Sequence, residues 1–409
     1  MTYRQGKIKR RLESIGMAPF VWLGWLYGRL FPLKQPTSHF LFFPWADMGG
    51  STRNNADIAA CIKDKKPLVI FSKKPRNNGF SHLFQQEDVR ILDLHRKIDN
   101  KLFHFVNFFY RGVLAAWICR SENPVVFGGE AIFFYKIIPH LRKDIPCVEL
   151  CHLDSWLGYS IGFIDLITQR ICSTRKLKEA ILQQYRENNV PPQFYERVHF
   201  IENKTDIPDY EEVHNPVLEV VYIGRGSPQK RVHLIAAIAA KMHTLGLPVH
   251  FSFAGDVETI IDTAAFPFCK FYGKVTDDAV LHAIRQHSDV LLLTSAFEGL
   301  PMVVMEMMAY GKVIVSTAVS GIPDYITHGE NGLLIRATDE EGVVQEGVEL
   351  LRTLIDDPDL KTRIGRHNRE IAIRKFGGGQ FCNEYRKALV RNSAAHPPQF
   401  PSASDTPRQ

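Results

Sequence analysis

Three absences narrow the classes of protein to which this sequence can belong. The apolar run of residues 17–31 is shorter than the roughly 20 residues of a membrane-spanning helix, and Arg29 interrupts it. No small-residue cleavage site follows that run, so we expect no secretory signal. The net charge is only +6 over 409 residues, which by itself does not indicate nucleic-acid binding, and we expect no nucleic-acid partner.

Cysteine is scarce and irregularly spaced. The seven cysteines are an odd number without the spacing of a disulfide framework, which favours reduced thiols in a cytoplasmic protein. Cys147 and Cys151 lie four residues apart, but no second pair is placed to complete a zinc site. We therefore expect no metal and no other cofactor.

The rest of the composition is that of a globular protein with two domains. Hydrophobic residues make up 45% of the chain and charged residues 23%. A length of 409 residues exceeds one ordinary core and predicts domains at 37–208 and 217–380, joined by a polar, proline-bounded linker at 209–216. We expect the tail 392–409, with its prolines and small residues, to be disordered.

Residues 1–36 form a separate segment that is basic and aromatic. Residues 1–35 contain one acid, Glu13, and these cations: Arg4, Lys7, Lys9, Arg10, Arg11, Arg29 and Lys34. Two interpretations remain open. The segment is either a helix lying in an anionic membrane interface, or a first helix packed on the protein's own core.

The first domain begins as a nucleotide-binding α/β unit does. An apolar strand at 39–44 leads into a turn that contains Gly49 and Gly50, and a helix follows. A later strand, 147–150, has His152 just beyond its carboxyl end. Ligands of open α/β sheets bind at this end of the strands, so we expect His152 to serve the site.

The second domain opens with an apolar strand, 218–223, and a glycine loop. The loop runs Gly224-x-Gly226-x-x-Gln229 and carries Arg225 and Lys230. It is close to a dinucleotide-binding fingerprint, but the third glycine is missing and no acidic residue ends a strand about 20 residues later. An NAD-dependent oxidoreductase therefore fits poorly.

The most informative stretch is 289–332. A buried strand, 290–293, is followed by a loop and then by a helix over 303–310, with Pro301 predicted at the first helical position. Glu298 precedes this helix and Glu306 lies within it, about 80° apart around the axis. The amides at the start of the helix suit a phosphate, which predicts a sugar-nucleotide site between the two carboxylates.

The whole block is more specific than the glutamate pair. It runs S-x-x-E-G-x-P-x-x-x-x-E-x-x-A-x-G from Ser295 to Gly311, and Gly321-Ile322-Pro323 and N-G-L-L follow. This resembles the signature of the retaining family 4 glycosyltransferases, which contain the glycosyltransferase group 1 domain. The resemblance implies an α/β protein of GT-B architecture, with two facing doubly wound Rossmann-like domains, an interdomain cleft, and a helix at 381–391 that crosses back to the first domain.

The resemblance also implies roles for individual residues. Glu306 would hold the ribose, Glu298 the hydroxyls of the donor sugar, and Arg225 with Lys230 the diphosphate, while His152 would face the sugar or the acceptor. The remaining donor-binding positions that it implies are Gly49, Gly50, Gly255, Gly273, Val275, Gly299, Leu300, Pro301, Met302 and Val303.

The function implied is that of a metal-independent hexosyltransferase that retains the anomeric configuration. It would move a sugar from a nucleotide diphosphate to a glycan or lipid-linked acceptor in cell-envelope polysaccharide or lipopolysaccharide synthesis, in the cytoplasm or at the cytoplasmic face of the membrane. Two alternatives remain open on the same fold: a sugar-nucleotide epimerase or hydrolase, and a sugar-nucleotide-binding protein without catalysis.

Overall fold

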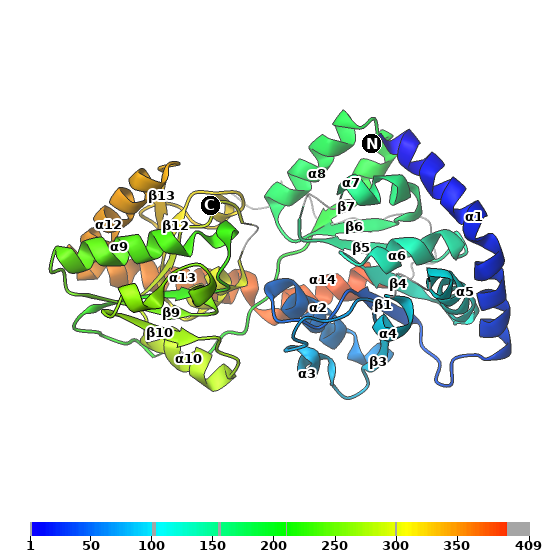
Figure 1. Cartoon of the computed structure of the whole chain (residues 1–409), viewed down its shortest axis with the longest axis horizontal. Helices are drawn as coiled ribbons and strands as arrows, with labels where there is room; N and C mark the ends of the chain where they lie inside the picture. The colour runs from blue at the N-terminus through cyan, green and yellow to red at the C-terminus, as the bar shows by residue number, and fades with distance from the viewer. Residues whose placement is uncertain (1, 100–103, 154–156, 210, 299–300, 391–409) are drawn as a thin grey trace, which may run out of the picture. The chain divides into compact units, whose positions relative to one another are not determined.

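The chain divides into two α/β units (Figure 1). The computed structural model describes residues 2–99, 104–153, 157–209, 211–298 and 301–390. The first unit comprises residues 1–173, 177–201 and 382–409, and the second comprises 174–176 and 202–381. The division after residue 201 comes earlier than the linker predicted at 209–216. The tail predicted to be disordered, 392–409, lies outside the described residues.

A seven-stranded parallel sheet forms the centre of the first unit, in the order β3-β2-β1-β4-β5-β6-β7. The strands are β1 (His39–Phe43), β2 (Leu68–Phe71), β3 (Arg90–Asp93), β4 (Val125–Gly128), β5 (Cys147–Cys151), β6 (Gln169–Cys172) and β7 (Val198–Phe200). The α-helices are α1 (Tyr3–Leu30), α2 (Gly50–Cys61), α3 (Ser81–Phe84), α4 (His95–Ile98), α5 (His104–Arg120), α6 (Ile132–Ile137), α7 (Leu157–Ser160) and α8 (Arg175–Glu187). The short 3-10 helices are η1 (Lys63–Lys65), η2 (Ile138–His140), η4 (Ile161–Leu166) and η5 (Pro192–Arg197).

Both faces of this sheet are covered, which explains why its strands are apolar throughout rather than alternating. Phe40 and Phe42 of β1 are fully buried in a cluster with side chains of α5 and α6. On the other face, the Phe43 ring contacts Phe127 of β4, which in turn contacts Tyr385 of α14 (Gly378–Ala388). The first unit is therefore a three-layered core to which helix α14 contributes.

The amino-terminal helix α1 packs along α5 (Figure 1). Glycines permit the close approach: a Cβ on Gly24 would lie 1.8 Å from the backbone oxygen of Phe109, and one on Gly112 of α5 would lie 1.9 Å from that of Val21. Both guanidinium Nη atoms of Arg10 also donate to Asp165, at 2.6 and 3.0 Å. One face of α1 thus packs on the core, as the second of the two interpretations requires. None of the described helices is both long and apolar enough to cross a membrane.

The expectation that all cysteines are reduced is wrong. Cys61 at the end of α2 and Cys382 in α14 form a disulfide, with their Cα atoms 5.0 Å apart. They are separated by 321 positions in the sequence, and only the fold brings them together, so their spacing held no signal. The other cysteines are free: Cys119, Cys147, Cys151, Cys172 and Cys269.

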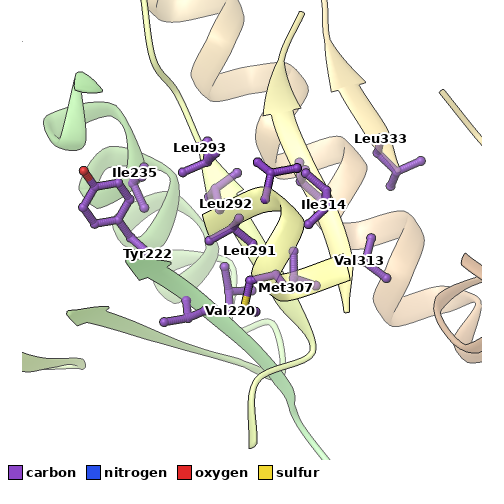
Figure 2. Close-up of a cluster of buried hydrophobic side chains, with 14 of the residues drawn as sticks. Val220, Tyr222, Ile235, Leu291, Leu292, Leu293, Met307, Val313, Ile314 and Leu333 are labelled. Atoms are coloured by element: carbon purple, nitrogen blue, oxygen red, sulfur yellow. The ribbon is translucent and has the colours of Figure 1, made fainter. Parts of the chain in front are cut away.

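The second unit is built on a six-stranded parallel sheet in the order β10-β9-β8-β11-β12-β13. The strands are β8 (Leu218–Ile223), β9 (Val249–Ala254), β10 (Cys269–Gly273), β11 (Val290–Leu293), β12 (Val313–Thr317) and β13 (Leu333–Ile335). The α-helices are α9 (Val232–Thr244), α10 (Asp278–His287), α11 (Met302–Ala309), α12 (Glu340–Asp356) and α13 (Pro358–Phe376). The 3-10 helices are η6 (Pro228–Lys230), η7 (Val257–Thr259), η8 (Thr263–Ala265) and η9 (Ile322–Asp324). The strands and helices share one hydrophobic core, in which Leu291 and Met307 lie at the centre (Figure 2).

The strand order places a switch point in each sheet. The chain adds β9 and β10 on one side of β8 and then crosses to add β11, β12 and β13 on the other. In the first unit the same reversal occurs between β1 and β4. Open α/β sheets bind ligands in the crevice beyond the carboxyl ends of two such strands. The candidate ligand-binding loops are therefore those after β8 and β11 and those after β1 and β4.

Candidate functional site

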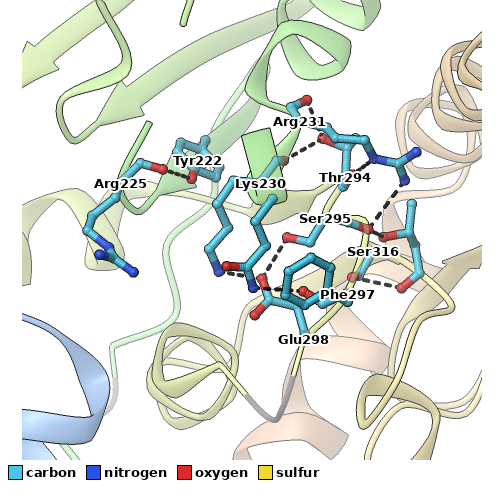
Figure 3. Close-up of polar contacts among 11 residues, drawn as sticks. Tyr222, Arg225, Lys230, Arg231, Thr294, Ser295, Phe297, Glu298 and Ser316 are labelled. Atoms are coloured by element: carbon cyan, nitrogen blue, oxygen red, sulfur yellow. Dashed lines mark hydrogen bonds and ion pairs between the residues drawn. The ribbon is translucent and has the colours of Figure 1, made fainter. Parts of the chain in front are cut away.

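The loops after β8 and β11 meet through an ion pair. The ammonium group of Lys230, in the first loop, contacts Oε1 of Glu298 in the second. The Ser295 hydroxyl donates to the same oxygen at 2.6 Å (Figure 3). The Glu298 side chain is only 7% exposed, and that of Lys230 is 16% exposed. Two residues predicted from the sequence to serve one site are therefore in direct contact.

The predicted second cation, Arg225, is exposed on the same loop. Its backbone carbonyl accepts a hydrogen bond from the Tyr222 hydroxyl at 2.8 Å, which fixes the start of the loop. Figure 3 shows the side chains of Arg225 and Lys230 extending to the same side of the loop. The arrangement presents two positive charges at the switch point, next to a carboxylate.

Arg231 is a residue of the site that was not predicted from the sequence. Its backbone is left-handed, with φ +45°, a conformation that costs a non-glycine residue about 1 kcal/mol. Its guanidinium donates to the carbonyl oxygens of Thr294 at 2.7 Å and Ser295 at 3.3 Å. The Thr294 hydroxyl donates in return to the carbonyl of Arg231 at 2.9 Å. Arg231 thus holds the Lys230 loop against the end of β11.

Glycines bring the ends of β8, β9 and β10 close together. Gly255 has φ +145°, and a Cβ there would lie 1.7 Å from the carbonyl oxygen of Gly224. Its N–H donates to the carbonyl of Gly273 at 2.8 Å. The Gly226 N–H donates to the carboxylate of Asp256 at 3.0 Å, a contact that the sequence analysis missed. Of the glycines predicted to bind the donor, Gly255 and Gly273 are therefore in direct contact, and Val275 follows Gly273, half-buried against the core of the unit.

Pro301 was predicted to be the first residue of the helix, but α11 begins one residue later. Pro301 is the residue before the helix, with φ −63° and ψ 132°, and Met302 is the first helical residue, followed by Val303. The cause is that an extended ψ at Pro301 redirects the chain just before the helix begins. Gly299 and Leu300, also predicted to bind the donor, lie outside the described residues.

Glu306 lies within α11 and pairs with a residue of α10. The Arg285 guanidinium donates to Glu306 Oε2 at 2.7 Å, with both side chains less than a fifth exposed. On the next turn, the Tyr310 hydroxyl lies 2.6 Å from Nδ1 of His282, also on α10. The carboxylate of Glu306 is thus oriented by α10. The sequence did not predict this pairing, because strand β11 separates the two helices and the sequence does not show which of their faces meet.

In the first unit, His152 follows β5, as predicted. Its backbone N–H donates to the carboxylate of Glu130, which follows β4, at 3.3 Å. Burial lowers the pKa of His152, because desolvation disfavours the imidazolium form. Among the described residues, no group hydrogen-bonds its buried Nε2 atom. Such an atom is normally satisfied, so His152 fits a role in binding a ligand.

Gly49 and Gly50 lie where β1 turns into α2, Gly49 being the residue before the helix. The turn is held by Asp47, whose carboxylate accepts hydrogen bonds of 2.9 to 3.0 Å from the backbone N–H groups of Arg76, Asn77 and Asn78. Burial alone raises the pKa of Asp47, but these N–H groups outweigh burial and the pKa is lowered. Asp47 was not predicted, since a lone aspartate after a strand gives no pattern.

The model of the family described as Glycosyl transferases group 1 matches residues 218–353, most of the second unit. N-acetyl-alpha-D-glucosaminyl L-malate synthase of Bacillus anthracis is 34% identical over 115 residues, 28% of each chain. The lipopolysaccharide core biosynthesis glycosyltransferase LpsE of Rhizobium meliloti is 29% identical over 102 residues, 25% of this chain and 29% of its own. The matched segment therefore spans less than a third of these two relatives.

Among solved structures, the fold matches that of Anabaena Alr3699/HepE, determined in complex with UDP and glucose. The TM-score is 0.66 at 18% identity, and the match covers 86% of this chain and 99% of that chain. At this identity the likeness establishes the fold alone. The sequence prediction of two Rossmann-like α/β domains of GT-B architecture is confirmed.

Proposed function

We propose, from the match of residues 218–353 to the group 1 glycosyltransferases, that the chain transfers a sugar from a nucleotide diphosphate to an acceptor hydroxyl with retention of the anomeric configuration. The observation that carries the proposal is the contact of Lys230 with Glu298 at the switch point of the second unit. The Lys230 ammonium group can bind a phosphate, and the Glu298 carboxylate can accept hydrogen bonds from sugar hydroxyls. Because the two side chains are in contact, both groups can bind the same ligand.

Lys230 and Arg225 are proposed to bind the diphosphate. As the bond between the anomeric carbon and the phosphate oxygen breaks, negative charge builds on the leaving diphosphate, and fixed cations stabilise it. Removing one such group from an active site costs about 10²- to 10³-fold in rate. The described residues contain no group of three or more His, Cys, Asp or Glu side chains that could hold a metal ion, and metal independence stays a prediction.

Glu298 and Glu306 are proposed to bind hydroxyl groups of the donor. Both contacts of Glu298 go to Oε1, so we assign Oε2 to the hydroxyls of the sugar. Glu306 is assigned to the ribose. Its Oε2 accepts from Arg285, and an ionised carboxylate has further acceptor sites for the ribose.

Retention is proposed to follow from attack on the same face that the diphosphate leaves. The acceptor oxygen bonds to the anomeric carbon as the carbon–phosphate-oxygen bond breaks, and its proton passes to the departing phosphate oxygen. This scheme needs no carboxylate nucleophile. His152, whose neutral imidazole has a buried Nε2 available within the described residues, is assigned to a hydroxyl of the sugar or the acceptor.

The donor and acceptor classes are proposed from the relatives. A uridine nucleotide is the first donor to test, because the HepE structure holds UDP and glucose. A glycan or lipid-linked acceptor of the cell envelope is favoured by the relative named for lipopolysaccharide core biosynthesis. The proposed location is the cytoplasm or its membrane face. The Cys61–Cys382 disulfide is unusual for a reducing compartment, so thiol titration of freshly isolated protein is a direct check on that location.

The experiment that tests the function is a turnover assay with UDP-sugars, in which released UDP is measured with and without candidate acceptors. We expect release to require an acceptor and to fall about 100-fold or more in Lys230→Ala. The matched control is Lys241→Ala, which removes an exposed cation from α9, and it should leave turnover unchanged. UDP release without any acceptor product would identify a hydrolase, conversion of the donor to another UDP-sugar without UDP release would identify an epimerase, and binding with neither would identify a non-catalytic protein. NMR of the product's anomeric proton decides between retention and inversion.

A further inference from the structure

Helix α1 has two apolar faces, and only one of them is used by the fold. Its inner face contains the buried residues Gly6, Arg10, Val21, Gly24 and Gly28. These positions are spaced by 4, 11, 3 and 4 residues, each close to a whole number of helical turns, so they lie on one side of the helix. The glycine contacts with α5 fix that side against the core, so the helix cannot rotate without separating the two backbones.

The outer face is a continuous apolar stripe. Its large side chains are Ile8 (50% exposed), Leu12 (65%), Ile15 (72%), Trp22 (60%), Leu26 (39%) and Leu30 (67%). They occur at i, i+4, i+7, i+14, i+18 and i+22, which places them on one side of the helix, opposite the glycines. A 28-residue helix is about 42 Å long at 1.5 Å per residue. Contiguous exposure on this scale marks an interaction surface rather than scattered surface residues.

The charges of the helix divide between the two faces. Arg10 and Lys7 are directed to Asp165, at 2.6 and 3.5 Å. Glu13, the only acid in residues 1–35, contacts Lys136 of α6 at 2.5 Å. The charged side chains on the inner side of α1 therefore form ion pairs with other residues of the protein.

The cations beside the stripe are exposed. Arg4, Lys9, Arg11 and Arg29 are exposed, and the first three accompany Ile8 and Leu12. Arg29 lies over the ring of Trp25, 4.7 Å from its centre. The one acid of residues 1–35, Glu13, is paired with Lys136 and does not balance them.

We propose that the outer face of α1 is a docking surface for an anionic lipid bilayer. An apolar stripe sinks to the level of the acyl chains while the flanking cations meet lipid phosphates, the arrangement of a helix that lies in the membrane plane. A second copy of this chain is the less suitable occupant, because pairing two such stripes would bring the cations of both copies together without an acid. The proposal thus assigns one of the two interpretations left open by the sequence to each face of α1.

The test is flotation of the full-length protein with vesicles of phosphatidylcholine alone or of phosphatidylcholine with phosphatidylglycerol. We expect binding to the anionic vesicles and weakening as salt is added. Arg4→Gln/Arg11→Gln should weaken binding roughly fivefold for each cation removed. Its control, Arg352→Gln/Arg363→Gln, removes two exposed cations from the second unit and should bind as the wild type does.

The apolar stripe is tested by Leu12→Glu/Leu26→Glu. We expect at least about a tenfold loss of vesicle binding, with an unchanged circular dichroism spectrum. Leu245→Glu, which changes a leucine that is 58% exposed in the second unit, should bind normally. If Leu12→Glu/Leu26→Glu binds vesicles as the wild type does, the proposal is wrong. Equal binding to uncharged vesicles also overturns it.

Self-association is the remaining outcome that would overturn the proposal. Light scattering that shows a dimer of the wild type and a monomer of the stripe variant, without vesicle binding, would assign the stripe to a second copy. Vesicle binding requires neither donor nor turnover. A failure here would leave the proposed sugar transfer standing, and a failure of sugar transfer would leave the membrane surface standing.

Discussion

Replacing Arg231 separates two opposing effects that act at the same residue of the candidate site. The guanidinium joins the Lys230 loop to the end of β11 through the carbonyls of Thr294 and Ser295. The backbone, however, has φ +45°, which favours glycine. Arg231→Ala removes the hydrogen bonds and keeps the unfavourable backbone, whereas Arg231→Gly removes both.

The magnitudes follow from these contacts. A hydrogen bond from a charged donor contributes about 1.5–3 kcal/mol, and the long second bond adds little, so Arg231→Ala should lose about 2 kcal/mol of unfolding free energy. Glycine relieves about 1 kcal/mol of left-handed strain, so Arg231→Gly should lose about 1 kcal/mol. The predicted order of stability is Arg, then Gly, then Ala. Turnover should fall in both variants because Lys230 loses the restraint on its loop.

Urea unfolding provides the measurement, followed for each variant by a signal from the unit that carries the substitution. Lys66 is the matched control: it has φ 50°, its side chain is 67% exposed, and it lies in the first unit. Lys66→Gly should be about 1 kcal/mol more stable than Lys66→Ala, which measures the strain alone. Equal stability of the wild type, Arg231→Ala and Arg231→Gly would refute the restraint, and so would unchanged turnover.

Three further perturbations test other parts of the structure. Arg285→Ala should weaken nucleotide binding about tenfold, since Glu306 loses its hydrogen-bond donor; calorimetry with UDP measures this, and unchanged affinity would contradict the pairing. Burial raises the pKa of Glu202 to about 7, so the neutral form is favoured in the fold. Its contribution to stability is therefore present below about pH 4.5 and lost as the pH rises through about 7. Glu202→Gln should be more stable than the wild type at pH 8, by at most about 3 kcal/mol, and not at pH 4. Unfolding free energies measured at the two pH values test this, and the same difference between variant and wild type at both would contradict it. Gly112→Leu should cost about 3 kcal/mol or more in the first unit because the side chain has no room against α1, whereas Gly16→Ala, with nothing within 4 Å of its Cβ, should not destabilise. Thermal unfolding of the two variants compares them directly, and equal midpoints would count against the helix packing.

The sequence predicted those parts of the fold that depend on local pattern. Apolar runs identified the strands at 218–223, which ends at Gly224, and 290–293, which ends at Thr294. Loops at the same ends of neighbouring parallel strands lie near one another. That argument was sufficient to place Lys230 and Glu298 in one site. It required only the strand order, which the resemblance supplied.

Contacts between segments distant in sequence were not predictable in this way. Arg285 reaches Glu306 from α10, and Asp256 reaches Gly226 from the loop after β9, through distances that depend on the register of helices and strands. The outer stripe of α1 was hidden for a related reason. A helix that is apolar on two sides gives no single amphipathic period, so its sequence did not distinguish the packed face from the exposed one.

Titration calorimetry of the purified protein with UDP, GDP, dTDP and NAD, with and without EDTA, tests the central claim most directly. The account predicts that one nucleoside diphosphate binds tightly regardless of EDTA. It also predicts that Glu306→Ala and Lys230→Ala lose this binding while Lys241→Ala keeps it. Binding of NAD in preference to every diphosphate, or diphosphate binding that survives both site variants, would contradict the proposed sugar-nucleotide site.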